Sequence, residues 1–326
     1  MATARGTLVA GWMMAAGVVV SILGLVLSVL SILPGQAASS ANWSRLTRLL
    51  VLAGGGGLVL FGAALGLLGL TLYVLVPAFS GRERALKDYG SHRVILASTA
   101  LAAVAGNLLA LLYFIPVVFL TPLAPAAGSG IEMARRLTSP TSIAVAAASL
   151  DVALMAVVYL RIVRPRAITW STMGLNLHHL KEQVPLGLAY GIALFGVSSL
   201  LELLLARAGI QQTQNITFQS VARASLSEFG LVLLAGAVVA PVAEEIYFRG
   251  YVFRAYLEQK GLWRALLFSS GLFAVVHMNL PALLPIFAMG IMLSSLYYRT
   301  GSIVPAIIAH ALNNAAAFTL LYLGLT

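Results

Sequence analysis

Residues 229–250 read FGLVLLAGAVVAPVAEEIYFRG, an apolar run that ends in two adjacent carboxylates and an arginine. Ionisable side chains are rare inside membrane spans, usually face the interior of the helix bundle, and mark functional sites. Glu245 and Arg249 are four residues apart with the glutamate first, the favourable order for a helical ion pair. Glu244 lies about 100° further round the helix and has no such partner. It is therefore the candidate for chemistry.

The composition of the whole chain is that of an integral membrane protein. Of its 326 residues, 60% are hydrophobic and 9% are charged, whereas soluble domains carry about 25% charged residues. Runs of about 20 apolar residues suit transmembrane helices rather than barrel strands. We therefore predict an all-α, polytopic helical membrane protein.

Apolar segments along the chain predict about nine transmembrane helices. The first follows Arg5, and its apolar run of about 27 residues exceeds the core of a signal peptide, so we interpret it as a retained helix. Before the sixth segment, Ser225 or Ser227 is a candidate helix cap. Gly187 and Gly191 have the small-xxx-small spacing that allows close helix packing. The approximate segment limits are 7–33, 49–76, 94–122, 140–163, 185–206, 229–248, 262–280, 282–298 and 302–324.

The distribution of basic residues predicts the orientation in the membrane. If nine segments span, 14 of the 20 Lys and Arg residues lie on the side of the N-terminus. Cytoplasmic loops carry the excess of basic residues, so the N-terminus and the loops around 82–93 and 254–264 are expected in the cytoplasm.

The two halves of the chain differ in where their polar residues lie. In region 1–184, of unassigned function, Asn107 and Asp151 are isolated polar groups within apolar segments, and Asp151 is interpreted as a structural hydrogen bonder or part of a proton path. Region 185–326 has a core at about 229–320, in which polar residues recur at regular spacings inside apolar segments. We expect the functional site in this second region.

Some classes of function are excluded or disfavoured by composition. The chain has no cysteine, which excludes cysteine-protease chemistry and a Cys-ligated zinc site. The net charge of +10 is spread over short loops. Charge distributed in this way serves orientation, and we expect no nucleic-acid partner.

Three motifs with four-residue spacing dominate the C-terminal half. They are Glu244-Glu245-x-x-x-Arg249, Phe273-x-x-x-His277 and His310-x-x-x-Asn314. Residues four apart share a helix face, so His310 and Asn314 point the same way, and Phe273 is expected to pack beside His277.

The depths of these motifs in the membrane agree roughly. At 1.5 Å per residue, Glu244, His277 and His310 lie about 15, 20 and 16 Å from the basic residues that mark the cytoplasmic side. The three side chains can therefore meet at a similar level.

The stretch from Pro241 to Asn314 resembles the CPBP family, which comprises type II CAAX prenyl endopeptidases and bacteriocin-processing or self-immunity proteins. The family pattern is EExxxR, FxxxH and HxxxN in that order, and all three motifs match. The surrounding sequence matches as well, at Arg249-Gly250, at residues 272–277 and at residues 298–305. The resemblance covers roughly 90 residues and leaves the front half uncovered.

The resemblance implies an intramembrane endopeptidase, a hydrolase. Glu244 would be the general base on a water molecule, and His277 would hold that water. His310 and Asn314 would stabilise the oxyanion, and Glu245 with Arg249 would form the supporting ion pair. Peptide hydrolysis needs a base, a water molecule and donors for the developing oxyanion, so the residue types fit.

The resemblance leaves the role of metal open, because the family is often called a metalloprotease family. Glu244, His277 and His310 could bind zinc, which commonly has three protein ligands at catalytic sites. There is no His-Glu-x-x-His helix, however. If Glu244 were a ligand, no second unpaired acid would remain as base. We favour a metal-free route with no cofactor.

Two other classes of function compete with the protease. One is a non-catalytic scaffold or chaperone of the same fold, and the other is an ion-coupled transporter using Glu244 and Asp151. Intact motifs argue against a scaffold, and no internal repeat supports a transporter. The short loops are typical of prokaryotes. We expect a bacterial or archaeal plasma-membrane protein, in contact with the bilayer, whose substrate is a membrane-associated protein, a CAAX-type or leader peptide, or a bacteriocin-like peptide.

Overall fold

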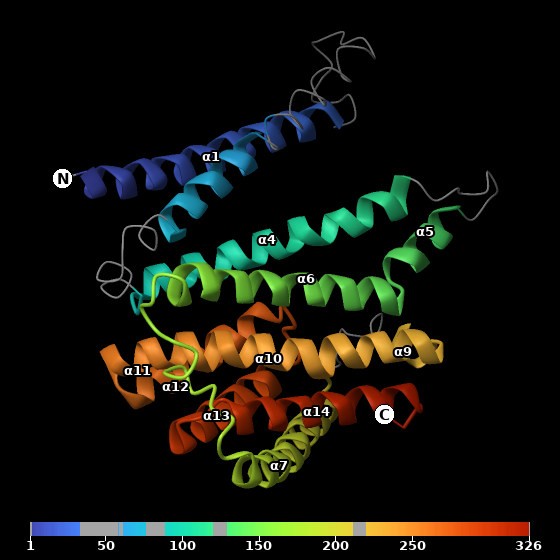
Figure 1. Ribbon diagram of the computed structural model, residues 1–326. Helices are drawn as coiled ribbons and strands as arrows, with labels where there is room; N and C mark the ends of the chain where they lie inside the picture. Colours follow the sequence, from blue (N-terminus) through green and yellow to red (C-terminus); the bar gives the residue numbers. More distant parts are fainter. Residues whose placement is uncertain are drawn as a thin grey trace. The chain divides into compact units, whose positions relative to one another are not determined.

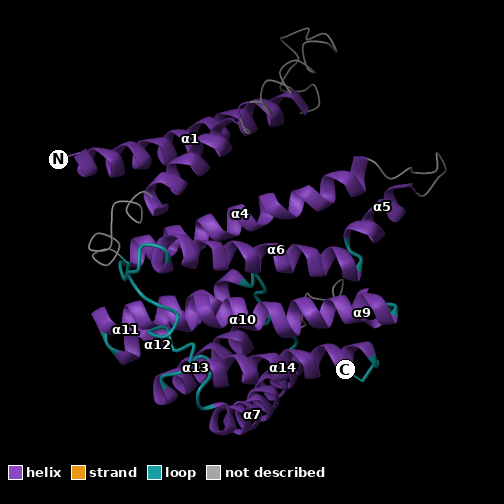
Figure 2. Cartoon of the chain, in the orientation of Figure 1, coloured by secondary structure: helices purple, strands orange, loops and turns teal. Residues whose placement is uncertain are grey.

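The computed structural model of the protein describes residues 2–32, 58, 61–75, 89–119, 129–210 and 220–325. These residues form helices joined by loops, with no strand among them (Figure 2). The predicted all-α class is therefore confirmed. The chain divides into two units, residues 1–81 and 82–326.

The first unit contains two described helices. They are α1, Ala2–Ile32, and a second helix, Phe61–Leu75. The first predicted segment, 7–33, thus lies in a helix, and the described part of the second segment, 49–76, is helical as well.

The second unit contains the remaining helices. A long helix, Leu226–Lys260, is built from successive α and π turns. Its parts are α9 (Leu226–Leu233), η2 (Leu234–Val239), α10 (Ala240–Glu244), η3 (Glu245–Phe253) and α11 (Arg254–Lys260), where η marks a π-helix. The other helices are α4 (His92–Phe119), α5 (Ser129–Leu137), α6 (Pro140–Val158), η1 (Tyr159–Val163), α7 (Leu180–Arg207), α12 (Leu262–Val276), α13 (Leu283–Thr300) and α14 (Val304–Tyr322).

Local sequence explains both ends of the long helix. Ser225 caps its start, because the Ser225 hydroxyl accepts from the Glu228 backbone N–H and the Glu228 carboxylate accepts from the Ser225 N–H. This reciprocal pair is a capping box. At the other end, Gly261 has φ of +81°. Glycine adopts this conformation without a Cβ clash, so the chain turns directly into α12.

Helix α6 packs against one side of the long helix, α4 packs on α6, and α14 packs against another side of the long helix (Figure 1). Helix α6 lies beside α9, α10 and η3, and α14 contacts η2 and α10. The segment with the two glutamates is therefore enclosed between α6 from the front half and α14 from the end of the described chain.

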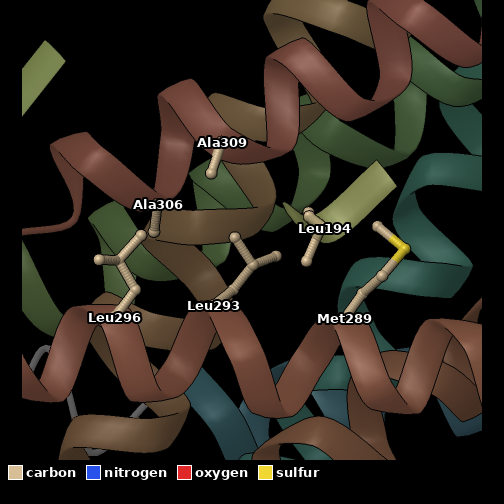
Figure 3. Close-up of a cluster of buried hydrophobic side chains, with 6 residues drawn as sticks. All are labelled: Leu194, Met289, Leu293, Leu296, Ala306 and Ala309. Atoms are coloured by element: carbon tan, nitrogen blue, oxygen red, sulfur yellow. The ribbon is translucent and has the colours of Figure 1, made fainter. Parts of the chain in front are cut away.

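Helices α7, α13 and α14 form a hydrophobic core of their own. Close packing of α7 on α14 depends on Gly191, where a Cβ would come within 3.0 Å of the Ala309 carbonyl oxygen. The predicted close approach at the Gly187 and Gly191 face is thus present. Figure 3 shows the cluster, which consists of Leu194, Met289, Leu293, Leu296, Ala306 and Ala309.

The predicted count of nine transmembrane helices is not confirmed. Among the described residues, six helices are long and apolar enough to cross a membrane: Val9–Val26, His92–Val118, Pro140–Val163, Leu180–Arg207, Leu226–Lys260 and Val304–Tyr322. Helix α12 is apolar but has 15 residues. It is about 22 Å long, whereas the hydrocarbon core of a bilayer is about 30 Å thick.

Candidate active site

The centre of the site is a buried ion pair inside η3. The Nη1 atom of Arg249 donates to Oε1 of Glu245 over 2.8 Å, and the side chains are 1% and 0% exposed. The Nη2 atom of Arg249 donates to the Gly290 carbonyl on α13, and the guanidinium carbon lies 4.5 Å from the centre of the Phe273 ring. The pair therefore joins the long helix to α12 and α13.

His310 on α14 lies against both glutamates. Its Nδ1 atom is 3.0 Å from Oε1 of Glu245, and its Nε2 atom is 3.7 Å from Oε2 of Glu244. The same Glu245 oxygen also accepts from Arg249, and a carboxylate oxygen acts as an acceptor, so we assign the Nδ1–H of His310 as the donor. The Nε2 atom then carries a proton only when the imidazole ring is cationic.

Glu244 differs from its neighbour in its surroundings. Its side chain is 16% exposed and accepts no hydrogen bond from any residue that the structure describes. The carboxylate oxygens of Glu244 thus remain available for a water molecule or a substrate, whereas Glu245 is engaged by two donors.

His277 occupies the C-terminal end of α12. Its Nδ1–H donates to the Phe273 carbonyl oxygen over 2.6 Å, which leaves the Nε2 lone pair free of that bond. The Phe273 and His277 rings are 4.7 Å apart, and the Phe273 ring also lies 5.9 Å from that of His310. Phe273 therefore contacts both histidines and Arg249. The described structure places His277 beside Phe273, and it shows no hydrogen bond or ion pair between His277 and either glutamate.

The backbone after His277 is strained. Met278 has φ of +50°, and its side chain is 93% exposed. A non-glycine residue in the left-handed region costs about 1–2 kcal/mol, and such residues cluster at functional sites. The turn ends α12 at His277 and leaves this histidine exposed at the helix terminus.

Asn314 binds a backbone carbonyl that the long helix leaves open. In η2 the Ala240 N–H donates to the Ala235 carbonyl oxygen, and the next residue, Pro241, has no N–H. Neither can serve the carbonyl of Gly236, which instead accepts from Nδ2 of Asn314 over 2.8 Å. The π-helical turn and Pro241 together create the acceptor that positions Asn314.

The predicted metal ligands do not form a ligand set. Among the residues that the structure describes, no group of three His, Cys, Asp or Glu side chains lies close enough together to hold a metal ion. Nδ1 of His310 and Nδ1 of His277 are engaged by Glu245 and the Phe273 carbonyl, respectively, an arrangement that leaves each Nε2 atom as the nitrogen that could ligate a metal. As placed in the described structure, however, Glu244, His277 and His310 do not converge as a set of three ligands.

Asp151 on α6 lies beside this site from outside the three motifs. Its side chain is 2% exposed, and its Oδ2 atom has no hydrogen-bond partner among the described residues. Its carboxyl group is within electrostatic range of Glu244. A front-half residue thus belongs to the surroundings of the candidate base, whether its role is structural or in proton transfer.

The sequence did not predict two backbone carbonyls that accept hydrogen bonds from site residues. It also did not predict the second amide side chain at the site. The carbonyls belong to Gly236 and Gly290, and Asn313 donates to Oδ1 of Asn314 over 3.1 Å. Pro241 is only a partial signal, because a proline in an α-helix removes the donor of the carbonyl four residues earlier, here Ala237. The π-helical turn, which no sequence feature marks, makes Gly236 the open acceptor. No sequence signal marks Gly290.

Comparison with known proteins bears on the same stretch of chain. Residues 226–316 match the family described as "Type II CAAX prenyl endopeptidase Rce1-like". This region is therefore similar to the CPBP family, whose three motifs it carries. The match includes all the predicted site residues, from Glu244 to Asn314, and excludes α4, α6 and α7.

A relative of the CPBP region occurs in Bacillus subtilis (strain 168). Its printed name is "Putative membrane peptidase YdiL", and it is 39% identical to this chain over 84 residues. The alignment covers 26% of this chain and 34% of the relative, so the two share about a third of the relative's length. No solved structure matches the chain significantly.

Proposed function

We propose that the protein is an intramembrane endopeptidase that hydrolyses peptide bonds with water activated by Glu244. The observation that carries the proposal is the unequal pair of glutamates. Glu245 is bound by Arg249 and His310, whereas Glu244 faces Nε2 of His310 and accepts no hydrogen bond from a described residue. The match of residues 226–316 to the type II CAAX prenyl endopeptidase family supports this assignment.

In the proposed reaction, Glu244 removes a proton from a water molecule that His277 helps to hold. The water oxygen bonds to the carbonyl carbon of the substrate, and negative charge develops on the carbonyl oxygen. His310 in its cationic form and an N–H of Asn314 stabilise this oxyanion. Glu244 then passes its proton to the departing amine as the carbon–nitrogen bond breaks.

The ion pair has a positioning role in this scheme. Glu245 accepts from Nδ1 of His310, which fixes the ring so that Nε2 faces Glu244. It also balances the positive charge that His310 carries when it donates to the oxyanion. Arg249 and Phe273 hold Glu245 and the histidine ring in place.

The proposed substrate is a membrane-associated peptide or protein, of the CAAX or leader-peptide class. The proposed location is a bacterial or archaeal plasma membrane, with the N-terminus in the cytoplasm. The excess of basic residues on one side and the family of residues 226–316 support this proposal.

The test is a comparison of three versions of the full-length protein in cells that lack it. Wild type, Glu244→Gln and Glu182→Gln are expressed at equal level, and new N-termini in the membrane fraction are mapped by mass spectrometry. Glu182 is an exposed acid at the start of α7 and serves as the matched control. We expect the same cleavages with wild type and Glu182→Gln, and their loss with Glu244→Gln.

Purified protein then separates the competing functions. Peptides that span the mapped sites should be cleaved by wild type in lipid nanodiscs and left intact by Glu244→Gln. A scaffold would change the abundance of membrane proteins without new N-termini. A transporter would show ion-dependent uptake in vesicles that Glu244→Gln abolishes, with no cleavage in either preparation.

A further inference from the structure

Two adjacent amides on α14 are linked by a hydrogen bond. Nδ2 of Asn313 donates to Oδ1 of Asn314 over 3.1 Å, and Nδ2 of Asn314 donates to the Gly236 carbonyl over 2.8 Å. Asn314 belongs to the HxxxN motif, whereas Asn313 belongs to none of the three motifs. The role of Asn313 is therefore not explained by the proposed reaction.

These two bonds fix the orientation of the Asn314 side chain. An amide group has two N–H donors on nitrogen and an acceptor oxygen. In the observed orientation, the oxygen of Asn314 faces a donor and its nitrogen faces an acceptor. The reversed orientation would set the oxygen against the Gly236 carbonyl and the nitrogen against the NH₂ group of Asn313. One N–H of Asn314 is used by Gly236, and the other is held in a defined direction.

Stability does not explain an asparagine at position 313. The side chain is 6% exposed, and its Oδ1 atom has no hydrogen-bond partner among the described residues. A buried, unsatisfied acceptor destabilises the folded state, whereas an apolar residue of similar volume carries no such cost. The Asn313 amide thus lowers the free energy of unfolding, and what it provides is a hydrogen bond to Asn314.

We propose that Asn313 is a positioning residue for the proposed peptidase reaction: its N–H holds the amide oxygen of Asn314, so that the second N–H of Asn314 points to the substrate carbonyl. The proposal rests on the proposed function for its chemical consequence. The hydrogen-bonded arrangement itself is independent of that function.

The decisive variant is Asn313→Leu, which removes the donor and the unsatisfied acceptor together. With a peptide that spans a mapped cleavage site, kcat should fall about tenfold while KM stays within about twofold, because the lost contact acts on the oxyanion. The midpoint of thermal unfolding should stay equal to that of wild type or rise. A purely structural role predicts the opposite, a lower midpoint with kcat unchanged.

A second readout needs no substrate. The chain has seven asparagines, so protein labelled with ¹⁵N-asparagine in nanodiscs gives few side-chain amide signals, and Asn314→Ala assigns that of Asn314. In Asn313→Leu, hydrogen exchange at the Asn314 amide should become at least about tenfold faster. Asn313→Gln retains an N–H donor and should restore part of the protection. Asn107→Leu, in α4, removes an exposed amide and should change neither readout.

The outcomes separate this proposal from the proposed function. Unchanged exchange and unchanged kcat in Asn313→Leu would overturn the positioning role while leaving the peptidase intact. Faster exchange in a protein that cleaves no peptide would establish the amide pair and reject the peptidase. Asn313→Leu with a lower unfolding midpoint and normal kcat would assign Asn313 to folding alone.

Discussion

Two glutamates that are neighbours in the sequence meet opposite surroundings. Glu245 is fully buried and its Oε1 atom accepts from Arg249 and His310, whereas the side chain of Glu244 is 16% exposed and lies 3.7 Å from His310. The Glu245 carboxylate is therefore engaged in contacts within the protein, whereas that of Glu244 accepts no hydrogen bond from a described residue. The different roles proposed for the two glutamates follow from which side of the helix each residue faces.

This difference predicts opposite effects of the same substitution. Glu245→Gln breaks a buried ion pair and leaves Arg249 without its carboxylate, which should lower the free energy of unfolding by about 3–5 kcal/mol. Glu244→Gln should change it by less than about 1 kcal/mol. Thermal unfolding of both variants in the same detergent provides the measurement. Equal losses of stability would contradict the assignment of the ion pair to Glu245.

At the residue scale, the sequence could predict contacts within a helix but few between helices. The spacing of Glu245 and Arg249 and that of Phe273 and His277 indicated their contacts, because residues four apart share a face. The bond between Glu245 and His310 joins residues 65 apart. Its geometry depends on how α14 packs on the long helix, which no local spacing determines.

The long helix gains its chemical features from irregular turns. The π-helical parts η2 and η3 lie on either side of α10, which contains Glu244, and Pro241 is the second residue after η2. Insertions of this kind rotate the residues after them and leave carbonyls without helical donors, which is why π-turns recur at functional sites. Here the carbonyl without a helical donor is that of Gly236, and Nδ2 of Asn314 donates a hydrogen bond to it.

A backbone N–H at position 241, which proline lacks, should therefore displace Asn314 from the Gly236 carbonyl and lower the activity. Pro241→Ala supplies an N–H that can bond to the Gly236 carbonyl in place of Asn314. The long helix should become more stable by up to about 3 kcal/mol, while kcat for peptide cleavage falls, because Asn314 loses its anchor. Pro116→Ala, within α4, is the matched control and should leave cleavage unchanged. Normal cleavage in Pro241→Ala would contradict this account of Asn314.

At the element scale, hydropathy located the helices and not their internal structure. Each of the nine apolar segments overlaps a described helix. The π-turns leave no trace in hydropathy, because they change backbone hydrogen bonds and not composition. The predicted segment 262–280 is longer than α12, which has 15 residues. The apolar run continues past His277 into the loop that contains Met278 and Leu280.

For the whole molecule, the direction of insertion is a prediction that the long helix can test. Its 35 residues extend about 52 Å, so its two ends should lie on opposite sides of the membrane. Ser227 and Gln259 are exposed near these ends, and the chain has no cysteine of its own. An impermeant thiol reagent applied to intact cells should label Ser227→Cys and spare Gln259→Cys until the cells are opened. The reverse pattern would overturn the predicted orientation.

Whether the proposed reaction needs a metal ion can also be tested on the intact protein. The favoured route uses no metal, so active purified protein should hold less than one equivalent of zinc, and its activity should survive dialysis against a strong chelator. Elemental analysis and cleavage kinetics on the same sample give the measurement. Stoichiometric zinc, with activity lost on removal and regained on addition, would establish a metalloenzyme in place of the glutamate-activated route.

The carbonyl of Gly236 has a further consequence for the order of events during synthesis. The ribosome produces Gly236 78 residues before Asn314, and Glu245 65 residues before His310. A nascent chain that has inserted the long helix but not α14 holds a carbonyl and a carboxylate in lipid without these partners. Docking of α14 therefore gives the Gly236 carbonyl and Oε1 of Glu245 these partners and supplies the proposed oxyanion donors in one event. We therefore expect a chain that stalls before this step to lack the donors of the proposed reaction and to be inactive as a peptidase.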